Sequence, residues 1–392
     1  MLGGVFVFLI SRKMTGIHGA AAAIVFFLFW PYAAIASRSF QPESLMIMMI
    51  AAGIWAAVNW VEKQSWWWAI LSGILCGFAI YVKSVAVFFV APAMAGLILT
   101  NFSFLKAIKN RQIWLIFALA VLPYTFYHLF GVLILGLLGQ QFNLRFFPAM
   151  WLDPVFYIKW IGELNRVVGL EIFLPAIFGV LIFPKKKYSG VLLGLVIGYI
   201  LYGFTFSYHI STHDYYHMPI FILVSLGLAH LVEGLLISVK SEKRKASVKL
   251  FIILLVVFML IKAWDVRTNL KRVDYRNEVG FWQNLGKEIG YDKKVTGLMA
   301  DYGYRLSYWG WMNVSPWMQT TDINLRELAG EEVDYLKSLE EITAGNDYFI
   351  VTSLDEFAQQ EQLESYLRSS FLVYKESEEV IIFDLKQRLE QD

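Results

Sequence analysis

Acidic and basic side chains lie unusually close to long apolar runs in this chain. The segment Ala-Ser-Arg-Ser-Phe-Gln-Pro-Glu-Ser-Leu, residues 36–45, separates two runs that are each long enough to cross a bilayer. Charges at Arg38 and Glu43 are costly there unless water, a partner or a ligand replaces their hydration shells. A carboxylate can assist a base or hold a metal, and a guanidinium can bind an anion. The alternative is that both are turn residues in the headgroup layer, with Pro42 opening the next helix.

Lys83 is a second basic residue between two apolar runs. It ends the segment Gly-Phe-Ala-Ile-Tyr-Val-Lys, residues 77–83, and only a very short turn precedes the next run. The ammonium is therefore held near the membrane surface, where a lipid phosphate is a natural partner. The alternative is a lysine that only anchors the helix end in the headgroup layer.

A loop at residues 207–219 gathers three of the six histidines. His209, His213 and His217 are spaced by four, so a helix would place them on one face. Imidazole suits divalent transition metals, and a divalent metal ion is therefore the one cofactor that the sequence suggests. The alternative is that the His and Tyr side chains settle at the headgroup layer. If the segment is extended, Tyr215 and Tyr216 point in opposite directions and only one need face a site.

The composition predicts an integral membrane protein. Of 392 residues, 57% are hydrophobic and only 17% are charged, which is too apolar for a soluble protein. The net charge of +2 and the short basic clusters give no reason to expect a nucleic-acid partner. The single cysteine, Cys76, excludes a disulfide within one chain.

Hydropathy predicts a polytopic helical domain over residues 1–264. Residues 2–10 are apolar but too few for a full span, so we expect the chain to begin partway through a helix. Nine full spans are predicted to follow, at residues 17–37, 45–61, 66–82, 85–99, 113–138, 170–183, 191–206, 219–237 and 250–264.

Alternate loops between these spans differ in Lys and Arg content. One set is rich in basic residues: Arg12, Lys13, Lys63, Lys106, Lys109, Arg111, Lys185, Lys186, Lys187, Lys240, Lys243, Arg244, Lys245 and Lys249. The other set holds Arg38, Lys83, Arg145, Lys159 and Arg166. The positive-inside rule places the first set in the cytoplasm. We therefore expect a multi-pass protein of the plasma (inner) membrane, with residues 36–45, Lys83, the histidine loop and everything after residue 264 on the outer face.

Residues 265–392 have the mixed, charged composition of a water-exposed domain. Helices are predicted at 273–289 and 355–368, buried strands at 294–299 and 347–352, and a hairpin of 371–374 with 380–385. The predicted fold class is thus an α-helical polytopic membrane protein with a small C-terminal α/β extracytoplasmic domain.

Taken in order, these motifs resemble a known family. The chain resembles the GT-C glycosyltransferases in the order of four segments. These are the first run, which ends in Ser-Arg-Lys, residues 36–45, residues 77–83, and His-Asp-Tyr-Tyr-His-Met-Pro at 213–219. The similar branch holds the protein O-mannosyltransferases and lipid A aminoarabinose transferases, glycosyltransferase family 39. The resemblance covers residues 1 to about 264, and the run at 301–311 resembles the outer domain of bacterial members.

The resemblance implies transfer of a sugar, with inversion, from a polyprenyl-phosphate carrier to an extracytoplasmic protein or glycolipid. The carrier and the surrounding membrane lipid are then partners of the protein. In that family an Arg, four residues and an acid open a span beside the active site, with Asp common where this chain has Glu. The implied roles are catalysis by Glu43, donor-phosphate binding by Arg38 and Lys83, and substrate binding by His213, Tyr215 and Tyr216.

The sequence departs from the family pattern in one respect, and two other function classes remain as alternatives. The principal catalytic carboxylate of the family lies in a first outer loop that nothing here matches, so we expect the chain as given to begin after that loop and to be inactive. A lipid-linked-sugar transporter or flippase is one alternative. It would need charges deep in the spans, and the only candidates, Glu233 and Lys262, both lie near span ends. A non-catalytic, membrane-anchored binding subunit is the other.

Overall fold

The chain forms two compact units, Met1–Leu270 and Lys271–Asp392, each described here by itself. A computed structural model describes residues 1–37, 41–139, 144–182, 184–238, 242–272, 275–331 and 334–389. The boundary predicted after residue 264 lies within helix α14 (Glu242–Arg272).

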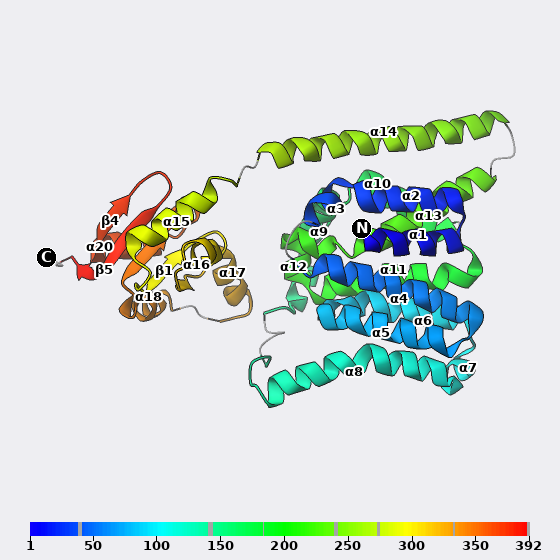
Figure 1. Ribbon diagram of the computed structural model, residues 1–392, viewed down its shortest axis with the longest axis horizontal. Helices are drawn as coiled ribbons and strands as arrows, with labels where there is room; N and C mark the ends of the chain where they lie inside the picture. The colour runs from blue at the N-terminus through cyan, green and yellow to red at the C-terminus, as the bar shows by residue number, and fades with distance from the viewer. Residues whose placement is uncertain are drawn as a thin grey trace. The chain divides into compact units, whose positions relative to one another are not determined.

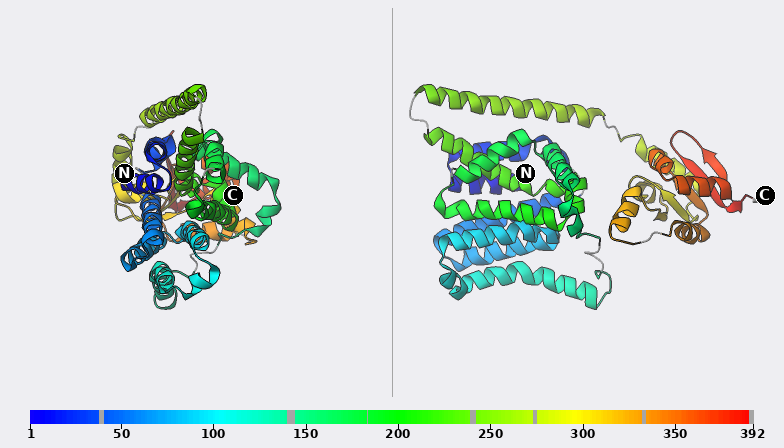
Figure 2. Two further views of the ribbon diagram at one scale, coloured as in Figure 1. Left: turned by 90° about the vertical axis from the view of Figure 1, so that its right-hand side faces the viewer. Right: turned by 180° about the vertical axis from the view of Figure 1, so that it is seen from behind.

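The first unit is helical (Figure 1), and the end-on view in Figure 2 shows many of its helices side by side. Besides α14, its helices are α1 (Leu2–Met14), α2 (Ile17–Phe29), α3 (Pro31–Ala36), α4 (Glu43–Lys63), α5 (Trp66–Val82), α6 (Val87–Asn101), α7 (Phe104–Lys109), α8 (Arg111–Leu133), α9 (Pro154–Val167), α10 (Leu170–Ile182), α11 (Lys186–Thr205), α12 (Ser207–Thr212) and α13 (Ile220–Ser238). Short 3₁₀ turns are η1 (Ser84–Ala86), η2 (Pro148–Leu152) and η3 (Asp214–His217).

Within the described residues, six helices are long and apolar enough to cross a membrane, or up to seven if the bent pair α9 and α10 forms one span. The segment predicted at 17–37 is divided, because Trp30 is extended and Pro31 begins a new helix, α3. The segment predicted at 66–82 is α5, an apolar helix of 17 residues. Helix α9, which hydropathy did not separate from its loop, meets α10 at 94°.

Glycine lets helices α6 and α11 touch backbone to backbone. A Cβ on Gly190 would lie 2.0 Å from the carbonyl oxygen of Gly96, and one on Gly194 would lie 2.1 Å from that of Pro92. One turn further, a Cβ on Gly198 would lie 2.0 Å from the carbonyl oxygen of Phe88. Small residues at this spacing allow close helix packing in a membrane, where burial of apolar surface contributes little to helix association.

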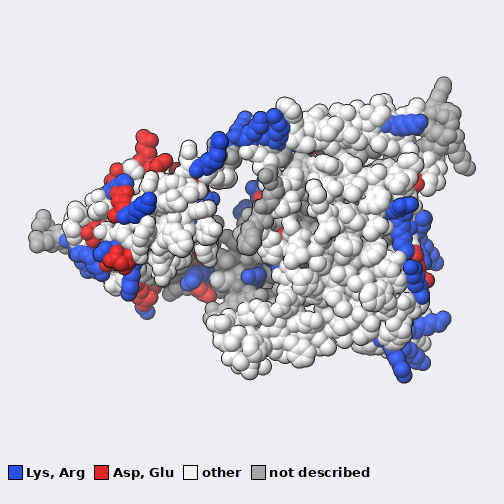
Figure 3. Space-filling view, in the orientation of Figure 1, with Lys and Arg blue, Asp and Glu red and all other residues white. Residues whose placement is uncertain are grey.

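The surface of the first unit separates by charge. Figure 3 shows Lys and Arg gathered where α1, α4 and α7 end and α8 and α11 begin, while the flank of the unit is uncharged. An uncharged flank between two polar ends suits a bilayer.

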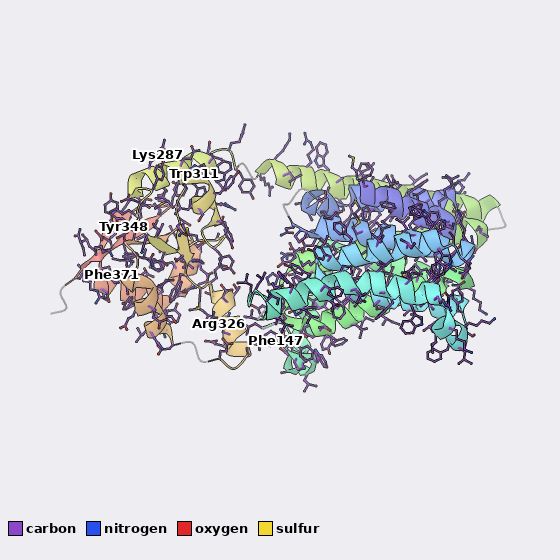
Figure 4. All side chains as sticks on the ribbon, turned by 60° about the horizontal axis from the view of Figure 1, so that its bottom comes forward. Phe147, Lys287, Trp311, Arg326, Tyr348 and Phe371 are labelled. Atoms are coloured by element: carbon purple, nitrogen blue, oxygen red, sulfur yellow. The ribbon has the colours of Figure 1, made fainter. Side chains whose placement is uncertain are left out.

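The second unit contains one mixed five-stranded sheet in order β2-β1-β3-β5-β4. Its strands are β1 (Val295–Leu298), β2 (Val314–Pro316), β3 (Tyr348–Val351), β4 (Phe371–Glu376) and β5 (Ile381–Arg388). Strand β1 is parallel to β2 and β3, whereas β5 is antiparallel to β3 and β4. Tyr348 and Phe371, labelled in Figure 4, begin β3 and β4.

Six helices accompany this sheet: α15 (Glu278–Ile289), α16 (Tyr304–Trp309), α17 (Thr320–Leu328), α18 (Tyr335–Ala344), α19 (Leu354–Gln359) and α20 (Glu361–Ser370). The strands predicted at 294–299 and 347–352 and the C-terminal hairpin are β1, β3 and the pair β4–β5. Strand β2 and helices α16 to α18 were not predicted.

Candidate functional site

Glu43 and Lys83 form a buried ion pair at one end of the first unit. Glu43 is the first residue of α4, is 2% exposed, and accepts a hydrogen bond from the Lys83 ammonium through Oε1. Lys83 ends α5 because its backbone is extended there. Oε2 of Glu43 is buried and has no hydrogen-bond partner within the described residues. Arg38, the other predicted phosphate-binding residue, lies outside the described residues.

The Lys83 ammonium also faces two aromatic rings. Its Nζ lies 5.2 Å from the ring centroid of Tyr215 and 5.3 Å from that of Tyr216, which is cation–π range. The expectation that only one tyrosine faces a site assumed an extended segment. The segment is instead the 3₁₀ turn η3, which brings both rings to the same ammonium.

His209 and His213 continue this aromatic cluster. Their rings stack with centroids 5.5 Å apart, and His209 also stacks on Tyr216 at 5.1 Å. Burial, and then the charges of His213, Arg145 and Lys83, lower the pKa of His209 from 6.5 to about 4. His209 is therefore neutral at pH 7, and its buried Nδ1 has no hydrogen-bond partner among the described residues.

His217 has a structural role in the same loop. Its Nε2 donates to the Ile210 carbonyl oxygen at 2.8 Å, because a carbonyl can only accept, and its Nδ1 accepts from the Tyr199 hydroxyl at 2.8 Å. That hydroxyl in turn accepts from Nε1 of Trp160 at 2.8 Å. The chain of bonds ties α9 and α11 to the histidine loop.

The predicted three-histidine face is wrong. Helix α12 ends at Thr212 and His213 adopts an extended conformation, so the loop is not one continuous helix. Both nitrogens of His217 are engaged, and no group of three His, Cys, Asp or Glu side chains within the described ranges could hold a metal ion. These residues do not fit a metal site as they are arranged here, and a metal requirement stays a prediction from the sequence.

Several neighbours of the site were not singled out from the sequence. Arg145 lies within electrostatic range of His209, Tyr215 and Tyr216. Arg166 on α9 contacts Glu163 at 2.5 Å and Asp214 at 3.4 Å. The only sequence signal was that Arg145 and Arg166 are among the few basic residues of the charge-poor loops. Phe147, labelled in Figure 4, packs near this loop with its ring 6.2 Å from that of Tyr208.

A cavity of about 610 Å³ lies beside the first turns of α4. It is lined by the first residues of α1, the end of α2, part of α3 and the start of α4 from Ser44, which follows Glu43 directly. Met218 and Phe221 complete the wall from the side of the histidine loop. The lining is mostly apolar, so the cavity suits a hydrocarbon ligand.

The two charges that the transporter alternative required have structural partners. Glu233 on α13 accepts a hydrogen bond from the Gly19 backbone amide at 2.9 Å, in the first turn of α2, where a carboxylate stabilises a helix. Lys262 lies 3.7 Å from Glu171 in a partly exposed pair.

Comparison with known proteins supports the resemblance inferred from the sequence. Residues 1–129 match the family model described as dolichyl-phosphate-mannose-protein mannosyltransferase. No curated protein sequence matches the chain.

Three solved structures share the fold at low identity. ArnT from Cupriavidus metallidurans bound to undecaprenyl phosphate has a TM-score of 0.59 at 12% identity, with 98% of this chain and 82% of that chain covered. The apo state of the same protein has a TM-score of 0.55 at 13% identity, with 98% and 81% covered. The mycobacterial arabinofuranosyltransferase AftD has a TM-score of 0.52 at 12% identity, with 98% of this chain and 33% of that chain covered. The predicted resemblance to the GT-C glycosyltransferases is thus confirmed: the first 129 residues match a mannosyltransferase family model, and the chain shares the ArnT fold.

Proposed function

We propose that this protein is a membrane glycosyltransferase of the GT-C type, which transfers a sugar from a polyprenyl-phosphate carrier to an extracytoplasmic protein or glycolipid with inversion. The observation that carries the proposal is the buried Glu43–Lys83 pair, whose ammonium faces the rings of Tyr215 and Tyr216, with an apolar cavity beside the first turns of α4. The basic residues at the opposite end of the first unit support an outer location for this site.

Lys83 binds the donor phosphate in this proposal. An ammonium is a phosphate ligand, and Arg145 adds positive charge within electrostatic range of the same tyrosines. Arg38 is a third candidate, from the sequence alone. The apolar cavity beside the first turns of α4 accommodates part of the prenyl chain in this proposal. The ArnT structure with undecaprenyl phosphate supports a ligand of this class.

The reaction that these groups can support is a single displacement. The acceptor hydroxyl oxygen forms a bond to the anomeric carbon on the face opposite the phosphate, while the bond from that carbon to the phosphate oxygen breaks. The leaving phosphate keeps the electron pair and is stabilised by Lys83. Oε2 of Glu43, which has no described partner, accepts the hydroxyl proton or assists the group that does.

The histidine loop forms the substrate-binding wall. His213 shares a hydrogen bond of 2.8 Å with the Thr212 hydroxyl, and its ring meets that of Tyr215 edge-on at 5.5 Å. Such contacts hold His213, Tyr215 and Tyr216 in place before substrate arrives. The aromatic faces suit a sugar ring or the first isoprene units.

Conversion of the donor tests the proposal. Membranes containing the protein are supplied with radiolabelled polyprenyl-phosphate sugar, and the release of sugar-free polyprenyl phosphate is measured, so the acceptor need not be known. Because nothing in the sequence matches the principal catalytic carboxylate of the family, the assay uses the chain joined to an N-terminal segment that supplies such a loop, and we expect release above that of membranes lacking the protein. Donor that crosses the bilayer unconverted would instead support a flippase, and donor bound but unchanged would support a binding subunit.

A further inference from the structure

The second unit has a polar cavity of its own. Its volume is about 370 Å³, within the range of ~300–1,000 Å³ typical of small-ligand pockets. The first turn of α15, the segments that follow β1 and β3, helix α16 and the turn between β4 and β5 line it. None of these residues belongs to the site around Glu43.

The cavity lies where the sheet topology favours a ligand. Strands β1 and β3 are parallel neighbours. The chain leaves β1 through α16 toward β2 on one side, and leaves β3 through α19 and α20 toward β4 and β5 on the other. Asp301 follows β1 and Thr352 follows β3, and both line the cavity. Ligands of open α/β sheets bind at such a divergence, outside the carboxyl ends of the strands.

The polar groups of the cavity are held in a fixed arrangement. The Arg305 guanidinium contacts Oε2 of Glu278 at 2.6 Å and Oδ2 of Asp301 at 3.2 Å. Glu379 is a third carboxylate on the wall. Three carboxylates and one guanidinium leave a formal charge of −2, so a phosphate or carboxylate ligand would be repelled.

Aromatic surface accompanies these charges. Phe281 and Trp282 line the cavity, and the ring of Tyr275, 58% exposed, lies 5.8 Å from the Arg305 guanidinium. Trp282 is only 7% exposed, and its Nε1–H has no hydrogen-bond partner within the described part of the chain. A buried donor left unpaired costs ~1–3 kcal/mol, so a ligand acceptor that reached Nε1 would be stabilising.

We propose that this cavity binds a saccharide without acidic groups, either neutral or amino-substituted. Sugar hydroxyls both donate and accept, so they pair with the carboxylates as donors and with the guanidinium as acceptors. The C–H face of a sugar ring packs against an aromatic side chain, and an amino group is favoured by the negative charge. The proposal does not depend on the transfer reaction.

The test is binding of named saccharides to the full-length protein in nanodiscs, measured by saturation-transfer difference NMR. The probes are methyl α-mannoside, glucosamine and glucuronate at millimolar concentrations. We expect saturation transfer, and therefore binding, for methyl α-mannoside and glucosamine, and little for glucuronate. Arg305→Lys keeps the charge but loses the forked geometry, and should weaken binding by about tenfold or more, the effect of a lost charge-assisted hydrogen bond.

A matched control exists within the same unit. Arg368 contacts Glu364, four residues earlier, at 2.8 Å and also Glu376 at 2.9 Å, an arrangement like that of Arg305. Arg368→Lys should leave saccharide binding unchanged. If the Arg305→Lys variant does not fold, Glu379→Gln is the second variant, because it changes an exposed side chain. It should weaken the binding of glucosamine more than the binding of the other probes.

Three results would overturn the proposal: no saturation transfer to any probe, equal losses of saccharide binding in the Arg305 and Arg368 variants, or preferential binding of glucuronate. Binding to anionic vesicles in place of saccharides would assign the aromatic surface to the membrane instead.

Discussion

Helix α4 carries a glutamate–lysine pair at each end, and the two pairs differ in how fully the carboxylate is used. At one end, both oxygens of Glu62 are engaged: Oε2 lies 2.6 Å from Lys13, and Oε1 accepts from the Tyr188 hydroxyl and lies 3.6 Å from Lys187. At the other end, Glu43 is more deeply buried, yet only Oε1 has a described partner. A fully engaged carboxylate stabilises the fold, whereas a buried oxygen without a partner is available for a ligand or a proton.

The largest expected effect concerns which end of the first unit faces out. Lys159→Cys on α9 should be labelled by a membrane-impermeant thiol reagent in intact cells, and Lys106→Cys on α7 only after the membrane is opened. Both positions are exposed, and the native Cys76 is buried, so background labelling is low. The reverse pattern would place the Glu43 site in the cytoplasm and contradict the proposed donor and acceptor sides.

Removing the charge of Glu43 should affect catalysis far more than folding. In the chain joined to that N-terminal loop, Glu43→Gln keeps the shape of the side chain, and we expect donor conversion to fall by ~10²-fold or more, the scale of lost acid–base assistance. Glu62→Gln is the control, and it should retain conversion while Tm falls by a few degrees, because a partly exposed pair contributes roughly 1 kcal/mol. Equal turnover in the two variants would show that the unpaired oxygen has no catalytic role.

Lys83 should matter for donor binding. Lys83→Ala is expected to weaken binding of polyprenyl phosphate by ~1–3 kcal/mol, or roughly 5- to 150-fold, as measured by scintillation proximity with labelled lipid. Lys63 offers a matched control. It is the last residue of α4, at the end opposite Glu43, and its ammonium also faces an aromatic ring, that of Trp68, at 5.1 Å. If Lys63→Ala weakens binding as much as Lys83→Ala, the lysines act only as membrane anchors.

The smallest expected effect is on the pH dependence of stability. Burial lowers the pKa of His217 from 6.5 to about 4, so between these values the unfolded chain binds a proton that the folded chain does not. Stability is therefore complete above pH 6.5 and declines as the pH falls toward 4. From pH 7 to pH 5 this histidine should lower the unfolding free energy by up to ~2 kcal/mol, visible as a lower Tm.

His217→Gln should reduce that pH dependence, and His18→Gln, which changes an exposed side chain, should not. An unchanged slope in His217→Gln would mean that other groups cause the loss of stability in acid.

Local patterns in the sequence predicted the elements that depend on local chemistry. Glu43 and Lys83 were found because each is a charge at the end of an apolar run, and both lie at helix ends that meet. Strands β1 and β3 were found because they are short, largely apolar runs that read as buried. Strand β2 was missed because it has three residues, ends in Pro316 and is largely exposed.

The remaining features depend on contacts between distant segments. The spacing of the histidines suggested one helical face, but His217 is engaged by Tyr199, from a different helix. Likewise, the placement of Arg145 within electrostatic range of Tyr215 depends on a loop that has no periodic pattern. Hydropathy also could not show that the chain turns sharply between α9 and α10, since both helices carry apolar residues.

The glycine contacts between α6 and α11 limit how the first unit can move. Helix α6 begins just after Lys83 and α11 ends just before the histidine loop, and their backbones already touch at Gly190, Gly194 and Gly198. Neither helix can slide or rotate against the other without a collision of main-chain atoms. The two helices therefore form one rigid pair between Lys83 and the histidine loop, so any rearrangement that admits the proposed lipid-linked sugar must come from other elements, such as α3 and the start of α4, which line the apolar cavity.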